Sequence, residues 1–315
     1  MKHIKRILLI VAAAFGVLLI SILIIGFKVD ISPQKLEEKY LTPESKYIQV
    51  LDANVHMRKR GSGPAIFLLH GSFASLHTWQ GWEDELSKSF TTISLDLPGH
   101  GLTGPNETET YTTDYYTKLV LALADSLKYD TFYVAGNSMG GTVAWKLALR
   151  APERVKKLVL IDAAGFWNAN KNTERPWIFK ALQNPLFGAG FTHITPKFVF
   201  NLNMKQVYGD ESLVRQEVTD RYYDLMLREG NREATLKRIK QDEPDQSNTI
   251  QQITTPTLIL WGKKDRWIPV ENAYLFQQAI NGSRLVVIDE AGHVPMEEVP
   301  SSSLKPVMEF LLKNP

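Results

Sequence analysis

The chain has 315 residues, of which 44% are hydrophobic, with a formal net charge of +2 and no cysteine. It can therefore bury a large core, either as one domain or as a domain with an insertion. The absence of cysteine excludes disulfides, cysteine metal sites and a thiol nucleophile, and no basic stripe interleaved with aromatic residues points to nucleic-acid binding.

The N-terminus carries a long apolar run. No charged residue interrupts it from Ile7 to Phe27, and a helix of that length spans about 30 Å, the thickness of a bilayer's hydrocarbon core. Because basic residues precede the run, we predict that residues 1–29 form a cytoplasmic tip and a transmembrane anchor. The remainder would then lie in the periplasm or at the cell surface. The alternative is a cleaved signal peptide, for which the run ends in a poor cleavage site.

Residues 30–45 are charged, contain two prolines and are expected to form a stalk. Strand-like and helical patterns then alternate through residues 46–163, which we predict to be the first part of an α/β core. The expected strands are 47–50, 54–57, 65–69, 91–95, 131–134 and 155–161, and the expected helices are 79–86, 115–128 and 142–150.

The alternation stops at about residue 164. Residues 164–251 contain many aromatic residues and no strand-like run, so we predict a helical cap inserted into the core. Alternation resumes in residues 252–315, with strands at 257–261 and 284–288 and a closing helix that ends at Leu312. Polar motifs follow nearly every predicted strand. In a mostly parallel sheet these motifs meet at one edge, where ligands bind.

The most informative motif is Gly136-Asn137-Ser138-Met139-Gly140, which lies between a strand and a helix. A serine on such a sharp turn takes strained backbone angles, so the residues two positions before and after it must be small. The turn presents the hydroxyl at a helix N-terminus, where developing negative charge is favoured. We therefore predict that Ser138 is a nucleophile.

A serine hydroxyl needs a base, and the base needs an acid that orients it. Among seven histidines, His293 alone follows the last strand, after the candidate acids, and completes the chain order Ser, acid, His. Asp265 follows the strand at 257–261 and is the favoured acid. Asp162, one strand earlier, is a rival because its carboxylate could reach the same imidazole. Asp96 is expected to be a structural turn residue.

The tetrahedral intermediate of acyl transfer needs two N–H donors for its oxyanion. The residue after the nucleophile, Met139, is expected to supply one backbone N–H. The loop after the strand at 65–69 is expected to supply the other, from Phe73.

From Tyr47 to Leu312, the chain resembles the α/β-hydrolase superfamily. The resemblance rests on five motifs in family order: His70-Gly71, Asp96-Leu97-Pro98-Gly99-His100-Gly101, the turn at Ser138, Trp261-Gly262-Lys263-Lys264-Asp265 and Gly292-His293. It implies an eight-stranded, mostly parallel sheet with helices on both faces and a helical cap. Bacterial serine esterases and lipases are the most similar members, and carbon–carbon bond hydrolases come next.

Three functions are therefore considered. The first is a membrane-anchored serine hydrolase that cleaves small apolar carboxylic esters through an acyl-enzyme. The second is a carbon–carbon bond hydrolase of the kind that cleaves ring-fission products, in which Arg221 would match a substrate-binding arginine of the cap. A salt-bridged helix residue is the other interpretation of Arg221. The third is an inactive binding protein on the same scaffold. No motif indicates a metal ion or an organic cofactor, and we expect neither.

Overall fold

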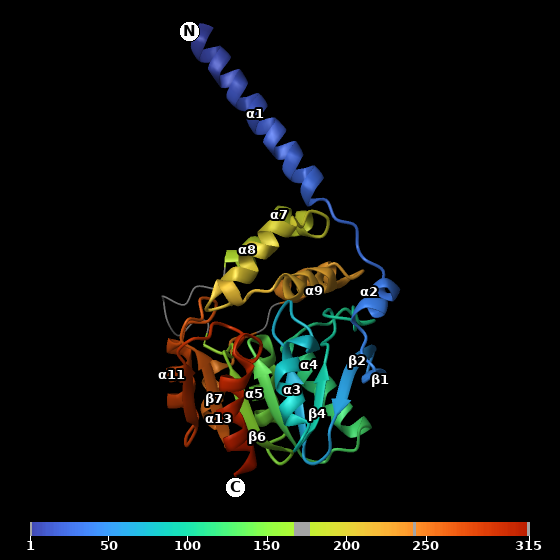
Figure 1. Cartoon of the computed structure of the whole chain (residues 1–315), viewed down its shortest axis with the longest axis vertical. Coiled ribbons are helices and arrows are strands. Elements are labelled where there is room, and N and C mark those ends of the chain that lie inside the picture. Colours follow the sequence, from blue (N-terminus) through green and yellow to red (C-terminus); the bar gives the residue numbers. More distant parts are fainter. Residues whose placement is uncertain (1, 167–176, 242–243, 314–315) are drawn as a thin grey trace.

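The computed structural model describes residues 2–166, 177–241 and 244–313 (Figure 1). One sheet of eight strands forms its centre, in the order β1-β2-β4-β3-β5-β6-β7-β8. β1 and β2 are antiparallel to their neighbours, and the pairs from β4 to β8 are parallel. The predicted eight-stranded, mostly parallel sheet is confirmed. The strands are β1 Ser45–Val50, β2 Ala53–Arg60, β3 Ala65–Leu69, β4 Thr91–Leu95, β5 Phe132–Asn137, β6 Val155–Ile161, β7 Thr257–Gly262 and β8 Arg284–Ile288.

Helices cover both faces of this sheet. One layer contains α4 Thr113–Ser126, α5 Met139–Arg150 and α11 Glu271–Ala279, and the other contains α3 Gln80–Leu86, α12 Pro295–Glu298 and α13 Pro300–Leu312. Successive strand residues point to opposite faces. In β3, Phe67 and Leu69 therefore pack under the first layer, whereas Ile66 and Leu68 pack under the second. This two-sided burial explains the continuous apolar runs in the sequence.

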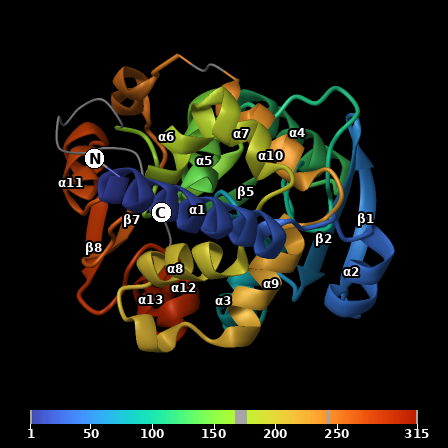
Figure 2. The ribbon, with the colours of Figure 1, turned by 90° about the horizontal axis from the view of Figure 1, so that it is seen from above.

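The chain between β6 and β7 is helical where the structure describes it. It contains α6 Trp177–Gln183, α7 Pro185–Phe191, α8 Lys197–Val207, α9 Gln216–Met226 and α10 Asn231–Lys240. Seen from above, these helices spread over one end of the strands (Figure 2). The part of the predicted cap at residues 167–176 and 242–243 lies outside the described residues.

The first helix, α1 Lys2–Gly26, extends away from the body (Figure 1). A helix that crosses a bilayer needs about 20 consecutive apolar residues. In the part of the chain that the structure describes, no helix combines the length and the apolar character that a crossing requires. The predicted transmembrane anchor is therefore wrong, as is the single-pass location with an extracytoplasmic catalytic domain that was derived from it.

The segment after α1 packs against the helices over the sheet. Arg232 of α10 is almost fully buried and donates to the carboxylate of Asp30, to the carbonyl oxygen of Lys28 and to Oγ1 of Thr195. In the segment expected to be a stalk, α2 Pro33–Tyr40 buries Leu36 against the body. A buried arginine has lost its hydration, so its N–H groups need acceptors from the protein, and the acceptors of Arg232 tie the segment after α1 to α10.

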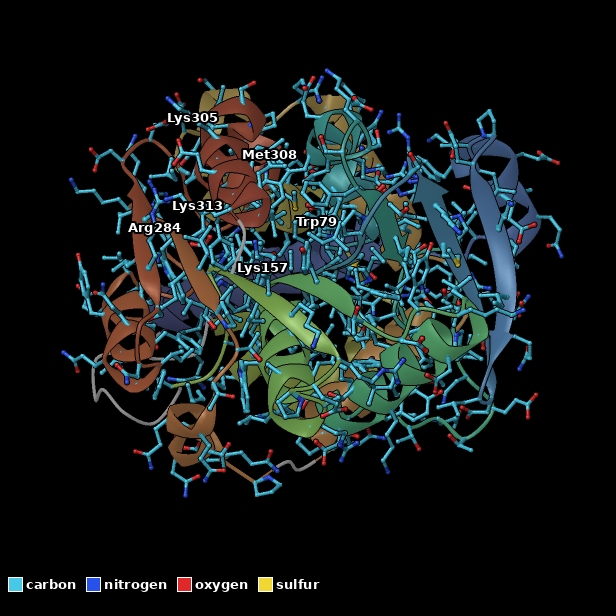
Figure 3. The ribbon with its side chains drawn as sticks, turned by 90° about the horizontal axis from the view of Figure 1, so that it is seen from below. Trp79, Lys157, Arg284, Lys305, Met308 and Lys313 are labelled. Carbon is cyan, nitrogen blue, oxygen red and sulfur yellow. The ribbon has the colours of Figure 1, made fainter. Side chains whose placement is uncertain are left out.

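The C-terminal helix is held at its end by the sheet. Lys157 of β6 donates from Nζ to the carbonyl oxygens of Phe310, Leu311 and Lys313, at 3.0, 2.8 and 2.5 Å. These carbonyls belong to the last turn of α13 and its C-cap, which have few intrahelical partners. Figure 3 shows Lys157 and Lys313 on the underside of the molecule, away from the cap. Burial lowers the pKa of the Lys157 amine.

The turn between β1 and β2 supplies a stability prediction. Leu51 has a φ of 52° there and is 54% exposed, so it bears left-handed backbone strain without burying its side chain. We expect Leu51→Gly to raise the free energy of unfolding by about 1 kcal/mol in urea titrations. Lys46→Gly, at an exposed position within β1, should lower the free energy of unfolding by a similar amount. Destabilisation by Leu51→Gly would contradict this account.

Candidate active site

Ser138 lies between β5 and α5 in a conformation that few residues adopt. Its φ is 55° and its ψ is −118°. A Cβ atom on Gly136 would lie 2.2 Å from the carbonyl oxygen of Gly140, and one on Gly140 would lie 2.2 Å from that of Leu69. Both positions therefore exclude larger side chains, which confirms the steric reason for the small residues around the predicted nucleophile.

Strained backbone recurs at the neighbouring strand ends. Among the described non-glycine residues with positive φ are Phe73 (62°) in the loop after β3 and Asp162 (44°) directly after β6. Together with Ser138, they border one region at the carboxyl edge of the sheet. Such strain persists where the surrounding structure enforces it, and it is concentrated at functional sites.

His293 is hydrogen-bonded to Asp265. The distance between Nδ1 of His293 and Oδ2 of Asp265 is 2.7 Å, and both side chains are almost fully buried. The other carboxylate oxygen of Asp265 accepts from the backbone N–H groups of Trp267 and Ile268, at 2.7 and 3.0 Å. The Trp267 ring stacks on the imidazole with 5.7 Å between centroids. Asp265 is therefore fixed in position, and it fixes the imidazole in turn.

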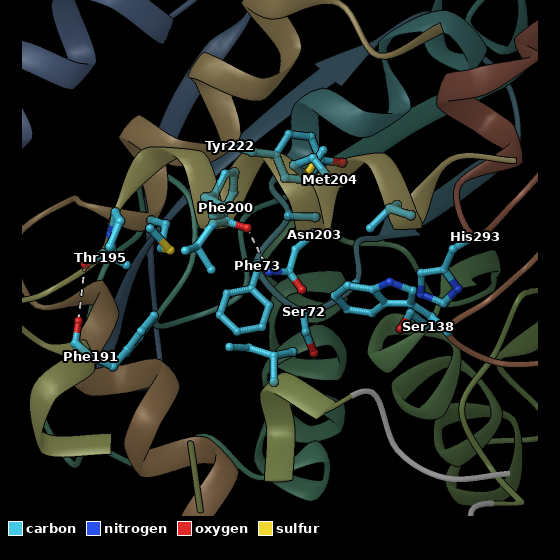
Figure 4. A pocket seen from close by; sticks show the side chains of 18 of the residues that line it. Ser72, Phe73, Ser138, Phe191, Thr195, Phe200, Asn203, Met204, Tyr222 and His293 are labelled. Atoms are coloured by element: carbon cyan, nitrogen blue, oxygen red, sulfur yellow. Dashed lines mark hydrogen bonds between the residues drawn. The ribbon is translucent and has the colours of Figure 1, made fainter. Parts of the chain in front are cut away.

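Ser138 and His293 line the same two cavities, and Figure 4 shows their side chains next to each other. Asn137 connects the turn at Ser138 to the histidine loop, because its Nδ2 donates to the carbonyl oxygens of His293 and Ile161, at 2.9 and 3.2 Å. Sequence reasoning noted Asn137 only as part of the motif. Its buried amide, between two loops far apart in the chain, is recognisable only after folding.

The rival acid, Asp162, does not replace Asp265 as the hydrogen-bond partner of His293. Its Oδ1 accepts from the backbone N–H of Gly262 at 2.9 Å. Burial, together with the neighbouring charge of Asp265, raises the pKa of the Asp162 carboxyl well above its ordinary value. The structure therefore brings both predicted acids to the site and pairs the imidazole with Asp265.

Among the described residues, one group of acidic and histidine side chains is close enough together to hold a metal ion. It consists of Asp162, Asp265 and His293, whose ligating atoms all lie within 4.8 Å of one another. Within this group, Nδ1 of His293 and Oδ2 of Asp265 are hydrogen-bonded to each other. A carboxylate bonded to an imidazole in this way is typical of an acid–base arrangement.

Glu298 is a second residue that sequence reasoning missed. Its carboxylate accepts from the backbone N–H groups of Gly292 and Val294, on either side of His293, at 2.9 and 3.1 Å. It also accepts from the N–H of Gly209, between β6 and β7, at 2.7 Å. The backbone N–H of His293 donates to the carbonyl oxygen of Val207 at 2.8 Å. The loop that carries His293 is thus attached to the helical segment between β6 and β7.

Asp96 shapes a loop, as predicted. Its carboxylate accepts from the backbone N–H groups of Leu76 and Leu102, at 2.7 and 2.8 Å, and bonds to His56. Nε2 of His70 accepts from the backbone N–H of Leu97 at 3.0 Å, and burial lowers the pKa of His70, which keeps the imidazole neutral. Neither residue bonds to Ser138 or His293 in the described hydrogen-bond network.

Two cavities meet at the site. The first has a volume of about 460 Å³ and is lined mainly by apolar residues of the loop after β3, of α7, α8 and α9, and of the segments around His293, including Phe73, Phe191, Phe200, Met204, Val207 and Met226. The second has a volume of about 620 Å³ and a more polar lining from α4, α5, α6 and α10, including Thr142, Lys146, Gln183, Lys240 and Gln241. Both volumes are typical of small-molecule sites. Of the predicted oxyanion donors, Phe73 lines the first cavity and Met139 the second.

Arg221 takes no part in either cavity lining. Its guanidinium donates to Oε1 of Glu297 at 2.7 Å, and Tyr222 donates to the other oxygen of the same carboxylate at 2.7 Å. The structure therefore supports the salt-bridge interpretation of Arg221.

The raised pKa of Asp162 predicts a pH-dependent stability difference. The folded state keeps a proton that the unfolded chain releases above a pKa of about 4, so this carboxyl makes the wild type less stable as the pH rises from there. Asp162→Asn removes that dependence and retains an acceptor for Gly262. We expect the stability gain of the variant, measured by urea unfolding, to be larger at pH 8 than at pH 5.

The matched control for that series is Asp130→Asn, which changes an exposed aspartate. It should show the same stability relative to wild type at both pH values. A gain for Asp162→Asn that shrinks as the pH rises would contradict the assignment of a raised pKa.

Comparisons with known proteins identify relatives of two kinds. The chain is 26% identical over 279 residues to 2-hydroxy-6-oxononadienedioate/2-hydroxy-6-oxononatrienedioate hydrolase 1 of Pseudomonas putida, covering 85% of this chain and 96% of that one. It is 29% identical to the pimeloyl-acyl-carrier-protein methyl ester esterase of Nitrosomonas europaea, covering 79% and 96%. A solved structure of a bacterial membrane phospholipase A superposes with a TM-score of 0.74 at 25% identity, covering 99% and 98%.

The family comparison gives the broader assignment. The family model of the alpha/beta hydrolase fold matches residues 64–300, most of the chain. That range contains the turn at Ser138, Asp265 and His293. The chain therefore belongs to the α/β-hydrolase family, and its activity is that of a hydrolase.

Proposed function

We propose that this protein is a serine hydrolase of carboxylic esters, in which Ser138, His293 and Asp265 form the catalytic triad. The observation that carries the proposal is the buried hydrogen bond between His293 and Asp265, beside a serine on a strained strand-to-helix turn. An acid that orients an imidazole next to a serine is the arrangement that activates a hydroxyl.

In the proposed mechanism, Oγ of Ser138 attacks the ester carbonyl carbon while Nε2 of His293 takes the hydroxyl proton. Asp265 accepts from Nδ1–H of His293, which keeps the proton-accepting nitrogen toward the serine and stabilises the imidazolium. The backbone N–H groups of Met139 and Phe73 are the proposed donors to the oxyanion. His293 then protonates the leaving alcohol, and a water molecule deprotonated by His293 hydrolyses the acyl-enzyme.

Ester cleavage is favoured over carbon–carbon bond cleavage by the contacts of Arg221. The carbon–carbon alternative gave this residue a substrate-binding role, but its guanidinium is bonded to Glu297 and lies outside both cavity linings. Relatives of both kinds exist, and the methyl ester esterase and the phospholipase A carry ester hydrolysis in their names. The apolar cavity beside Ser138 suits an apolar acyl group.

The first test is Ser138→Ala with short 4-nitrophenyl acyl esters as substrates. Loss of the nucleophile should lower kcat/KM by about 10³-fold or more, because the triad acts as a unit. The control variant Ser302→Ala changes an exposed serine on α13 and should have the same kcat/KM as the wild type. Full activity of Ser138→Ala would disprove the mechanism.

A second test separates the two reactions. Wild-type kcat/KM for 4-nitrophenyl butyrate should exceed that for a vinylogous diketone of the ring-fission type by about 100-fold or more, because Arg221, the residue matched to the substrate-binding arginine, is bonded to Glu297 and lines neither cavity. A preference for the diketone would establish the carbon–carbon alternative.

A fluorophosphonate probe tests the third function, an inactive binding protein. Failure of Ser138 to react with this probe would support that function.

A further inference from the structure

The two cavities share a narrow set of residues. Of the residues that line each, Ser72, Ser138, Trp267 and His293 line both. The side chains of the proposed nucleophile and base therefore stand where a largely apolar space meets a more polar one. An ester has two substituents on opposite sides of its reacting group, so a substrate at Ser138 would place one substituent in each cavity.

The first cavity offers few free polar groups. Figure 4 shows it extending from Ser138 and His293 at one end to Phe191 and Thr195 at the other. Polar side chains in its lining are already bonded to the protein: Thr195 to the carbonyl oxygen of Phe191, Asn203 to that of Val199, and Tyr222 to Glu297. A long hydrocarbon chain would meet a hydrophobic wall there, whereas a hydroxylated group would lose hydrogen bonds to water.

The second cavity has a mixed lining with many more polar groups than the first. Thr142 and Lys146 of α5 face it together with Gln183 of α6 and Lys240 of α10, and charged residues of both signs contribute to its lining, including Asp245. Lys146 is almost fully buried and is paired with Asp114 at 3.1 Å. Hydroxyl, amide and charged groups at one site suit a ligand rich in hydrogen-bonding groups.

A row of aromatic rings runs from one cavity lining to the other. Phe73 lines the first cavity, Phe179 lines the second and Trp267 lines both. Phe179 lies 6.0 Å from Phe73 and 6.0 Å from Trp267, between ring centroids. Because Trp267 also stacks on His293, this row ends at the proposed base.

The requirement for water decides which substituent occupies which cavity. After the alcohol leaves, a water molecule must reach the acyl-enzyme next to His293. Apolar cavities stay dry, whereas water enters cavities that offer it hydrogen-bond partners. The polar cavity borders His293, so departure of the alcohol from that cavity would open a path for water while the acyl chain remains in the apolar cavity.

We propose that the substrate is an ester of an apolar acyl chain with a hydrophilic, hydroxyl-bearing alcohol, whose acyl chain occupies the apolar cavity and whose alcohol occupies the polar one. This inference rests on the proposed ester hydrolysis at Ser138. It adds the orientation of the substrate and the polarity of both substituents.

The experiment compares two esters of similar size and reversed polarity, 1-octanoylglycerol and octyl glycerate. The wild type should hydrolyse 1-octanoylglycerol with at least about tenfold higher kcat/KM, since only this ester matches both cavities. Equal rates, or a preference for octyl glycerate, would overturn the proposal. If neither is cleaved while Ser138-dependent cleavage of 4-nitrophenyl butyrate persists, the substrate class is wrong and ester hydrolysis stands. If no ester is cleaved, the proposed function itself fails.

Two variants test the cavities one at a time. Val199→Trp narrows the apolar cavity and should lower the kcat/KM ratio of 1-octanoylglycerol to 1-acetylglycerol by about tenfold or more. Gln183→Trp narrows the polar cavity and should lower the ratio of 1-octanoylglycerol to methyl octanoate to a similar degree. The matched controls, Leu312→Trp and Gln278→Trp, lie outside both linings and should leave these ratios as in the wild type. Ratios that change equally in a variant and its control would contradict the assignment.

Discussion

The close contact between the Ser138 turn and strand β3 is the constraint on which the site depends. Gly140, in the first turn of α5, lies so near the carbonyl oxygen of Leu69 that a Cβ atom there would be 2.2 Å from it. This contact places the first turn of α5 against the end of β3, and Ser138, directly before α5, has a φ of 55°. The hydroxyl then stands beside the loops after β3, β6, β7 and β8, which carry the other groups of the site.

The helical segment between β6 and β7 is hydrogen-bonded to the loop that carries His293. Glu298 joins the backbone on both sides of His293 to Gly209, and Glu297 bonds to Arg221 and Tyr222 of α9. The same segment supplies the wall of the apolar cavity through α7 and α8. The wall of the apolar cavity and the position of the imidazole are therefore physically connected.

Much of this arrangement was predictable from local patterns. Buried parallel strands produce continuous apolar runs, so the sheet and the polar ends of its strands followed from the sequence, including the places of Ser138, Asp265 and His293. The predicted transmembrane anchor was wrong: α1 forms at the apolar run, but no helix of the described residues meets the requirements for crossing a membrane. Asp265 was favoured over Asp162 as the acid, but the sequence did not exclude Asp162, because chain order is the same for both.

The sequence by itself determined the family and the residues at the strand ends, because strand periodicity and the small residues around Ser138 are local requirements. The tertiary structure decided which groups meet. It paired His293 with Asp265, bonded Arg221 to Glu297, and made Asn137 and Glu298 links between distant loops. It also formed two cavities of different polarity at one serine. Such contacts join residues separated by long stretches of chain, and their geometry depends on how the helices pack above the sheet.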